Sequence, residues 1–363
     1  MAMYRYIRPL LFRIDPERAH DFAIELCRFA GRVPMAEAFL EHLFQCEDSR
    51  LEVTIGNLTF PNPVGLAAGF DKDGQALSIL QALGFGAIEA GTVTPMPQPG
   101  NPKPRMFRLQ EDQALINRMG FNNAGVDALV ERMRCLVRKI PIGINLGKGK
   151  ETEIDDAARD YRYGMDRAWE VADYFTVNVS SPNTLDLRRL QREDFLLPLL
   201  KTILEFRDRQ ASKTGEHKQI WLKIAPDLKV GELEAIVDIA LRTRIEALVI
   251  ANTTVSRPRL SGRYRDQTGG LSGRPVKSLS DEILKRAHTL TKGEIPLIGV
   301  GGIFTAEDVY RKLSLGASMV QVYTGFVYRG PGMVQHIKRR LQAIMVREKR
   351  VRISEITGCA FRK

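Results

Sequence analysis

The sequence predicts a closed (β/α)8 TIM barrel with an N-terminal helical extension and a short hairpin that caps the bottom of the barrel. After residue 60, short apolar runs alternate with longer amphipathic stretches, as expected for parallel strands buried on both faces and joined by helices. The eight runs are residues 62–69, 87–93, 142–147, 174–180, 220–225, 247–252, 296–302 and 319–324. The 363 residues exceed the roughly 250 of a typical barrel. A doubly wound sheet is the alternative that this alternation leaves open.

Three of the stretches between the runs have clear helical patterns. Residues 305–317 begin with Thr305 and Asp308 in the spacing of a capping box. Residues 231–243 and 281–290 place apolar residues three and four positions apart. We therefore expect helices over these three ranges.

Two elements precede the barrel. Residues 51–60 form two short strands around Gly56-Asn57, a two-residue hairpin turn, and we expect this hairpin at the N-terminal end of the barrel. Before it, Asp15 is a good N-cap and Pro16 suits the first helical position. One helix runs from there to Gly31, and a second covers residues 35–44. The apolar face of the first helix consists of Ala19, Phe22, Ala23, Leu26, Phe29 and Ala30. We expect two domains, a helical segment over residues 1–48 and a catalytic barrel over residues 49–363.

Composition limits the classes of function. The net charge of +11 favours an anionic substrate, an anionic lipid surface or a nucleic acid. The four cysteines form no CxxC pair, which argues against a disulfide framework or a metal site and fits a reducing compartment. No stretch approaches the roughly 20 apolar residues that span a bilayer, and the opening MAMYRYIRPLLFRI is too charged for a signal peptide. We expect a cytoplasmic chain that can still lie against a membrane.

Polar residues cluster at the predicted strand ends, where barrels of this kind carry their reactive groups. Those at or just after a strand are Lys72, Thr92, Asn145, Lys148, Asn178, Ser181, Asn183, Lys223, Asn252, Thr253, Thr254, Tyr323 and Thr324. Five asparagines at one rim suit a flat heterocycle with several carbonyl and N–H groups. They are Asn117, Asn145, Asn178, Asn183 and Asn252. Each asparagine taken singly is also a common turn residue.

Glycines and lysines add a binding site for anions. Gly301 and Gly302, followed by a helix that starts at Thr305, predict a phosphate site, although glycines also make tight turns. Lys223 lies in an apolar strand and requires an anion, which is a ligand or a buried Asp or Glu. Lys72 follows Asp71 directly, so a local ion pair is the alternative to a ligand there.

The sequence resembles dihydroorotate dehydrogenase of the membrane-associated, quinone-dependent class. The resemblance extends from about Tyr4 to the helix after Gly330. The resemblance rests on the motifs NPVGLAAGFDKDG, EAGTVTPMPQPGNPKPRMFR, LINRMGFNN, VNVSSPNT, KIAPDL, ANTTVSRP, DQTGGLSGRP, IGVGGI and VQVYTG. It implies an FMN flavoprotein that oxidises (S)-dihydroorotate to orotate in pyrimidine biosynthesis. The implied electron acceptor is ubiquinone or menaquinone.

The resemblance also implies roles for individual residues. FMN is expected to contact Ala68, Gly69, Thr92, Asn145, Asn178, Lys223, Gly273, Gly302, Tyr323 and Thr324. Substrate is expected to contact Lys72, Asn117, Arg118, Met119, Gly120, Phe121, Asn178, Asn183, Asn252 and Thr253. Ser181 matches the base that removes the C5 proton while a hydride leaves C6 for flavin N5, and Lys72 and Asn183 complete the catalytic set. Because a serine hydroxyl is a weak base, it must pass its proton onward. Ala251 departs from relatives that carry a hydroxyl beside FMN.

The first 48 residues point to the same class, because the soluble relatives use a cysteine as base and lack this extension. Aromatic and aliphatic residues between Arg5, Arg8 and Arg13 suit a bilayer boundary. The residues that match the quinone tunnel are His20, Arg108 and Tyr323. We expect a peripheral monomer on the cytoplasmic face of the membrane that binds no nucleic acid. The alternative is a helical pair that only packs on the barrel.

Two other classes of function are alternatives to this one. The tRNA dihydrouridine synthases are also FMN barrels, but they need a cysteine where this chain has Ser181 and a separate RNA-binding domain, whereas only a short basic tail over residues 338–352 follows the last strand. A membrane-binding module without catalysis would leave the asparagines and lysines of the rim without a role.

Overall fold

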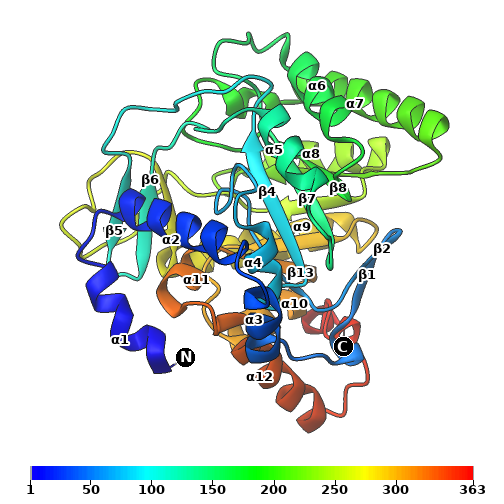
Figure 1. Cartoon of the computed structure of the whole chain (residues 1–363). Helices are drawn as coiled ribbons and strands as arrows, with labels where there is room; N and C mark the ends of the chain where they lie inside the picture. Colours follow the sequence, from blue (N-terminus) through cyan, green and yellow to red (C-terminus); the bar gives the residue numbers. More distant parts are fainter. Residues whose placement is uncertain (1, 363) are drawn as a thin grey trace.

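The computed structural model describes residues 2–362 and contains the predicted barrel (Figure 1). Eight parallel strands close on themselves in the order β10 (Ala247–Ile250), β12 (Leu297–Val300), β13 (Ala317–Val322), β3 (Val64–Leu66), β4 (Ala87–Val93), β7 (Ile142–Leu146), β8 (Tyr174–Asn178) and β9 (Gln219–Ile224). In the sequence, each strand overlaps one of the eight predicted runs. Because β9 pairs with β10 and the ring is closed, the doubly wound alternative is wrong.

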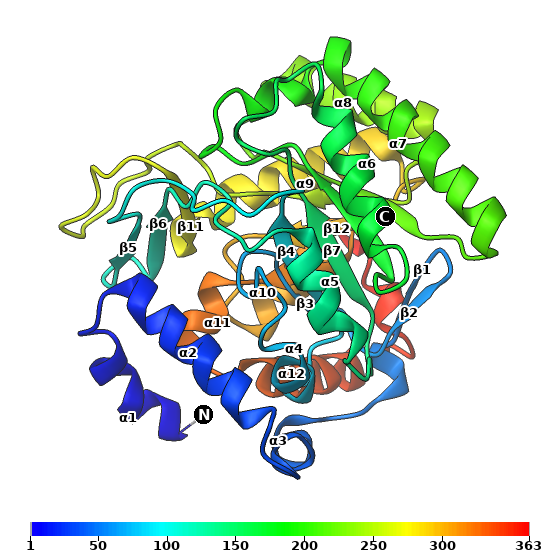
Figure 2. The ribbon, with the colours of Figure 1, turned by 45° about the horizontal axis from the view of Figure 1, so that its top comes forward.

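Helices surround the barrel (Figure 2). They are α4 (Leu77–Ala82), α5 (Val126–Arg134), α6 (Ala157–Ala168), α7 (Glu193–Thr214), α8 (Val230–Thr243), α9 (Lys277–Thr291), α10 (Ala306–Ser314), α11 (Thr324–Arg329) and α12 (Met333–Arg347). The predicted capping box of α10 is confirmed, since the Thr305 hydroxyl accepts from the Asp308 backbone N–H and the Asp308 carboxylate accepts from the Thr305 backbone N–H. α9 begins before the predicted residue 281, directly after a 3-10 turn over Arg274–Val276.

The predicted hairpin is also present and consists of β1 (Val53–Ile55) and β2 (Leu58–Phe60). The ring of Phe60 lies 6.1 Å from Trp221 and 6.5 Å from Tyr174, near the starts of β9 and β8. The side-chain amide of Gln219, the first residue of β9, donates to the Ile55 carbonyl at 2.6 Å. The hairpin therefore closes the N-terminal end of the barrel.

A small antiparallel sheet was not predicted. It consists of β5 (Met106–Leu109), β6 (Ala114–Asn117) and β11 (Gly270–Gly273), in the order β11-β6-β5. Its strands come from two loops that follow β4 and β10, so its pairing joins segments far apart in the sequence. Together they form one side of the region beyond the barrel's strand ends (Figure 2).

Three helices precede the barrel where the sequence predicts two. They are α1 (Ala2–Leu11), α2 (Pro16–Ala30) and α3 (Ala36–Phe44). The additional helix is α1, which contains Pro9 in its last turn, a residue that supplies no N–H to the hydrogen-bond ladder. The cap of α2 is as predicted, since the Asp15 carboxylate accepts from the backbone N–H groups of Glu17 and Arg18 at 3.1 Å each.

The predicted apolar face of α2 is largely uncovered. Phe22, Leu26 and Phe29 are 57%, 55% and 67% exposed, and further exposed apolar residues lie on α1 and α3. Single exposed apolar residues are ordinary in soluble proteins, but a group of this size on three neighbouring helices is typical of an interaction surface. Between residues 2 and 362, no helix combines the length and apolar character needed to cross a bilayer.

Candidate functional site

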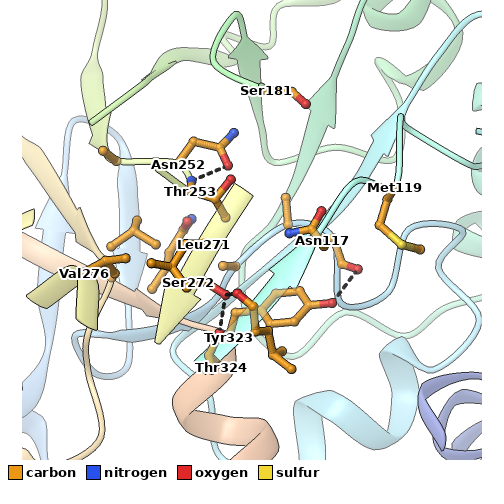
Figure 3. A pocket seen from close by; sticks show the side chains of 18 of the residues that line it. Asn117, Met119, Ser181, Asn252, Thr253, Leu271, Ser272, Val276, Tyr323 and Thr324 are labelled. Atoms are coloured by element: carbon orange, nitrogen blue, oxygen red, sulfur yellow. Dashed lines mark hydrogen bonds between the residues drawn. The ribbon is translucent and has the colours of Figure 1, made fainter. Parts of the chain in front are cut away.

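A cavity of about 1170 Å³, counting its open mouth, lies at the C-terminal ends of the barrel strands (Figure 3). The predicted site residues that line it are Ala68, Gly69, Lys72, Thr92, Asn117, Met119, Gly120, Phe121, Asn178, Ser181, Asn183, Lys223, Asn252, Thr253, Gly273, Gly302, Tyr323 and Thr324. The barrel thus brings side chains from distant segments to one mouth.

Two predicted contact residues do not line the cavity. Asn145 is fully buried behind it, where both ends of its carboxamide bond to protein groups. Arg118 points away, because its guanidinium lies over the Phe107 ring and donates to Gln267 and to the Pro104 carbonyl. Alternate residues of an extended segment face opposite sides, and the neighbours Asn117 and Met119 face the cavity instead (Figure 3).

A buried carboxylate lies at the centre of the barrel beneath this cavity. Glu89 on β4 is 1% exposed and accepts hydrogen bonds from Asn145 at 2.6 Å, Thr176 at 3.0 Å and Gln321 at 2.8 Å. The Lys223 ammonium lies 3.7 Å from the same carboxylate. The buried Asp or Glu that the sequence left open as the partner of Lys223 is therefore present, and it is Glu89.

Glu89 orients the groups that face the cavity. Because the Asn145 amide donates to Glu89, its carbonyl oxygen must face the opposite way, where it accepts from Thr92 at 2.5 Å and from Asn178 at 3.0 Å. Asn178 also donates to the Thr92 hydroxyl at 3.1 Å. The polar floor of the cavity is thus fixed by bonds among protein groups.

The two adjacent serines after β8 have different surroundings. The Ser180 hydroxyl is fully buried, donates to the Asn178 carbonyl oxygen at 2.8 Å and accepts from the Asn252 amide at 2.9 Å. Ser181 lines the cavity, and its oxygen accepts one hydrogen bond, from the Asn183 backbone N–H at 3.2 Å. Of the two serines, only Ser181 therefore lines the cavity.

Lys72 makes no local ion pair with Asp71. The Asp71 carboxylate instead accepts from the backbone N–H groups of Gln75 at 2.9 Å and Ala76 at 2.7 Å. Across residues 2–362 the Lys72 ammonium takes part in no hydrogen bond or ion pair, and burial lowers its pKa. A half-buried cation without a partner at a cavity wall favours an anionic ligand.

Glycines on the cavity lining allow their loops to pack closely on neighbouring protein segments. Gly273 has φ +102° and Gly302 has φ +73°, so both need the left-handed region. A Cβ atom at Gly302 would lie 2.5 Å from Cα of Lys277, and one at Gly273 would lie 2.3 Å from the Gln113 carbonyl oxygen. α10 starts after Thr305, and its capping box already engages the backbone N–H groups of Phe304, Thr305 and Asp308, so this helix end offers none of those three to a ligand.

The residues matched to a quinone tunnel divide into two groups. The rings of His20 and Tyr323 lie 5.2 Å and 5.7 Å from the ring of Phe70, and Tyr323 lines the cavity. Arg108 stacks on Phe12 at 4.2 Å and donates to the carbonyl oxygens that follow α1. His20 is therefore near the cavity, whereas Arg108 fixes the connection between α1 and α2.

Three residues with clear structural roles at the site were not predicted from the sequence. They are Glu89, Gln321 and Arg188. The first could have been found, because a carboxylate within the buried run AIEAGTV needs a partner as much as Lys223 does. Arg188 donates to the carbonyl oxygens of Ser180 and Thr253 at 3.0 Å each and fixes the second half of the loop after Ser181.

Comparisons with known proteins agree with the resemblance. The family model described as dihydroorotate dehydrogenase matches residues 50–345. A relative from Gloeobacter violaceus, named dihydroorotate dehydrogenase (quinone), is 46% identical and covers 99% of this chain and 100% of its own length. One from Synechococcus sp. with the same name is 48% identical and covers 94% of this chain and 93% of its own. The crystal structure of DHODH in complex with ferulenol from Eimeria tenella is similar with a TM-score of 0.88, at 38% identity over 96% of each chain.

We expect Glu89→Gln to destabilise the fold. The change leaves Lys223 buried without its counter-charge and presents an NH2 group to donors, so the free energy of unfolding should fall by about 3 kcal/mol. Thr176→Val is the matched control, because it removes one donor to Glu89 and keeps the charge pair, at a cost of about 1 kcal/mol. Urea denaturation measures both. Equal stability of Glu89→Gln and the wild type would contradict this role.

The second expectation concerns His20. Burial, and then the charge of Lys72, lower its pKa from 6.5 to about 4. Between pH 6.5 and 4 the unfolded chain therefore binds a proton that the folded chain does not, so stability falls as the pH is lowered. His20→Gln should reduce that loss by about 2 kcal/mol, measured by urea denaturation at several pH values. An unchanged pH dependence would show that His20 is not held neutral.

Proposed function

The chain belongs to the dihydroorotate dehydrogenase family and oxidises dihydroorotate to orotate with a quinone as electron acceptor, and we propose that the cavity at the strand ends is where this reaction takes place. The observation that carries the proposal is the convergence of an unpaired ammonium, Lys72, and a free hydroxyl, Ser181, on one cavity above the buried Lys223. No packing requirement explains all three.

The residues present fit the family's cofactor, FMN. At one end, Gly301, Gly302, Thr324 and Gly325 from the segments after β12 and β13 line the cavity, and these two loops are where this fold commonly binds phosphate. At the other, the buried side-chain oxygen of Gln321 has no hydrogen-bond partner in residues 2–362, and Lys223 supplies a positive charge. An apolar wall that includes Val300 and Leu271 joins the two ends. A flat polar ring with an anionic tail matches this order of groups.

FMN would be held by the residues that the resemblance implies for it and that also line the cavity. They are Ala68, Gly69, Thr92, Asn178, Lys223, Gly273, Gly302, Tyr323 and Thr324. Asn145 would act from behind, since it fixes Thr92 and Asn178. Ala251, which stands where relatives often carry a hydroxyl residue, also lines the cavity. When bound, FMN supplies the acceptor for the hydride that leaves C6 of dihydroorotate.

We assign the substrate to the wall that carries Lys72 and the asparagines. Dihydroorotate has a carboxylate, which the Lys72 ammonium would neutralise, and a ring of alternating carbonyl and N–H groups. Asn117, Asn183 and Asn252 present both donors and acceptors to such a ring. Met119, Gly120 and Phe121 bound the same side, whereas Arg118 does not line the cavity.

Ser181 acts as the base at C5 in this proposal. The Asn183 backbone N–H, which donates to the Ser181 oxygen, stabilises negative charge that develops there as the hydroxyl gives up its own proton. Ser180 is unsuited to this role because its proton and one lone pair are already engaged by Asn178 and Asn252. Asn183 therefore serves twice, through its backbone on Ser181 and through its side chain on substrate.

We assign residues 1–48 to the membrane and the quinone, and residues 49–363 to catalysis. The exposed apolar residues of α1, α2 and α3 would enter the bilayer boundary, with the exposed Arg5 and Arg13 at lipid phosphates. Arg8 is engaged with the Tyr328 carbonyl instead. A quinone would pass between these helices toward Phe70 and Tyr323. We propose that the chain is a peripheral monomer on the cytoplasmic face of the membrane.

Ser181→Ala tests the base. We expect the variant to retain FMN and to bind orotate, while reduction of its flavin by dihydroorotate slows by about a thousandfold, the usual range for loss of a general base. Anaerobic stopped-flow absorbance measures the reduction. Near-wild-type reduction by Ser181→Ala would remove this residue from the mechanism, and wild-type protein that dihydroorotate does not bleach would contradict the activity itself.

Flotation with vesicles of phosphatidylcholine and phosphatidylglycerol tests the membrane surface. Phe29→Glu on α2 should weaken vesicle binding by at least tenfold, because it replaces an apolar contact by a charge that anionic lipid repels. Val230→Glu is the matched control, since Val230 is 60% exposed at the start of α8, away from these helices (Figure 1). Equal loss of binding in both variants would argue against a specific surface on the N-terminal helices.

A further inference from the structure

A buried ion pair joins the N-terminal helices to the barrel. Glu17 in the first turn of α2 and Arg105 just before β5 are each 6% exposed. The guanidinium donates to the Glu17 carboxylate at 2.8 Å and 3.1 Å. Two apolar side chains would hold α2 against β5 at a lower desolvation cost. Packing alone therefore does not explain why an ion pair is present here.

Arg105 uses its remaining nitrogen on a loop of the barrel. Its Nη1 donates to the carbonyl oxygens of Pro99 at 2.6 Å and Asn101 at 2.8 Å. Gly100 between them has φ +75°, and a Cβ atom there would lie 2.8 Å from that nitrogen. The loop therefore wraps closely around the guanidinium, and its position depends on Arg105.

Asn101 extends this contact to two walls of the cavity. Its side-chain amide donates to the carbonyl oxygens of Asn183 and Arg118 at 3.0 Å each, and its backbone N–H donates to Met119 at 2.9 Å. A Cβ atom on Gly120 would lie 2.7 Å from the Asn101 carboxamide. The side chain of Asn101 thus bridges the segment 117–121 and the loop after Ser181.

Asn183 is the end of the path. Its backbone N–H donates to the Ser181 oxygen, and its side chain donates to Asn117 at 3.2 Å. Hydrogen bonds and one ion pair therefore run without a break from α2, through Arg105 and Asn101, to the residue that holds Ser181. In Figure 2, α2 lies beside β5, at the start of this path.

We propose that Glu17 and Arg105 are positioning residues for the substrate wall, acting through Asn101 on Asn183 and Ser181. The inference rests on the proposed function, because it takes Asn183 as a substrate ligand. α2 is also the helix assigned above to the membrane and the quinone. The structure thus links the acceptor side of the enzyme to the affinity for dihydroorotate, and by reciprocity substrate binding affects the seating of α2.

The test uses the full-length holoenzyme with Glu17→Gln and Asn101→Ala. We expect Asn101→Ala to raise the dissociation constant of orotate and the KM for dihydroorotate about tenfold, and Glu17→Gln about fivefold. The KM for the quinone should change less than twofold in Asn101→Ala. Because both residues act on one path, the double variant should match the more severe single variant.

Lys103→Ala is the matched control. Lys103 also pairs with Glu17, at 3.2 Å, but it is 64% exposed and has no bond to the loop 99–101. Its removal should leave the orotate dissociation constant within twofold of wild type. Additive effects in the double variant, or an unchanged orotate dissociation constant in Asn101→Ala, would overturn the proposal.

A readout without substrate separates this proposal from the proposed function. Amide hydrogen exchange of the segment 179–186 should be at least threefold faster in Glu17→Gln than in Lys103→Ala. If dihydroorotate fails to reduce the wild type, the proposed function fails, while faster exchange still supports the path. If the wild type is active and exchange in Glu17→Gln is unchanged, the path is wrong.

Discussion

A carboxylate enclosed within a barrel has to be matched by donors from the strands around it, and the rest of this site depends on that match. Glu89 receives bonds from β7, β8 and β13 and a charge from β9. Burying these groups is costly, and the network is stable only because nearly every polar atom has a partner. The network also fixes the orientation of Thr92 and Asn178 before a ligand binds. Such preorganisation lowers the cost of ordering side chains during binding and catalysis.

The strands of the barrel were predictable because a strand that is buried on both faces consists of a continuous run of apolar residues. The residues at their ends were predictable as a group, because the parallel order places all the C-terminal ends at one rim. What lies beyond that rim was not. β5 and β6 are short strands of one hairpin, and β11 pairs with β6 across a long stretch of chain, so no local pattern marks the sheet as a whole. Long-range pairing is the information that a single sequence carries least well.

Finer errors have a similar origin. Asn145 and Asn178 look alike as single asparagines after apolar runs, yet one is buried behind the cavity and the other lines it. The difference depends on Glu89, a neighbour on another strand. Arg118 was assigned to substrate with its whole motif, whereas its side chain packs on Phe107. Motifs assign segments to a site, and the direction of each side chain follows from partners that the motif does not contain.

The closure of the barrel sets the order in which the chain is able to fold. β3 lies between β4 and β13, and the bond from the Tyr323 hydroxyl to the Gly69 carbonyl spans 254 positions. During synthesis β3 leaves the ribosome early, and one of its edges stays open until almost the whole chain has emerged. Unpaired strand edges of this kind promote aggregation, and such distant contacts slow folding. A nascent barrel of this design therefore leaves that edge exposed to other chains until translation is nearly complete.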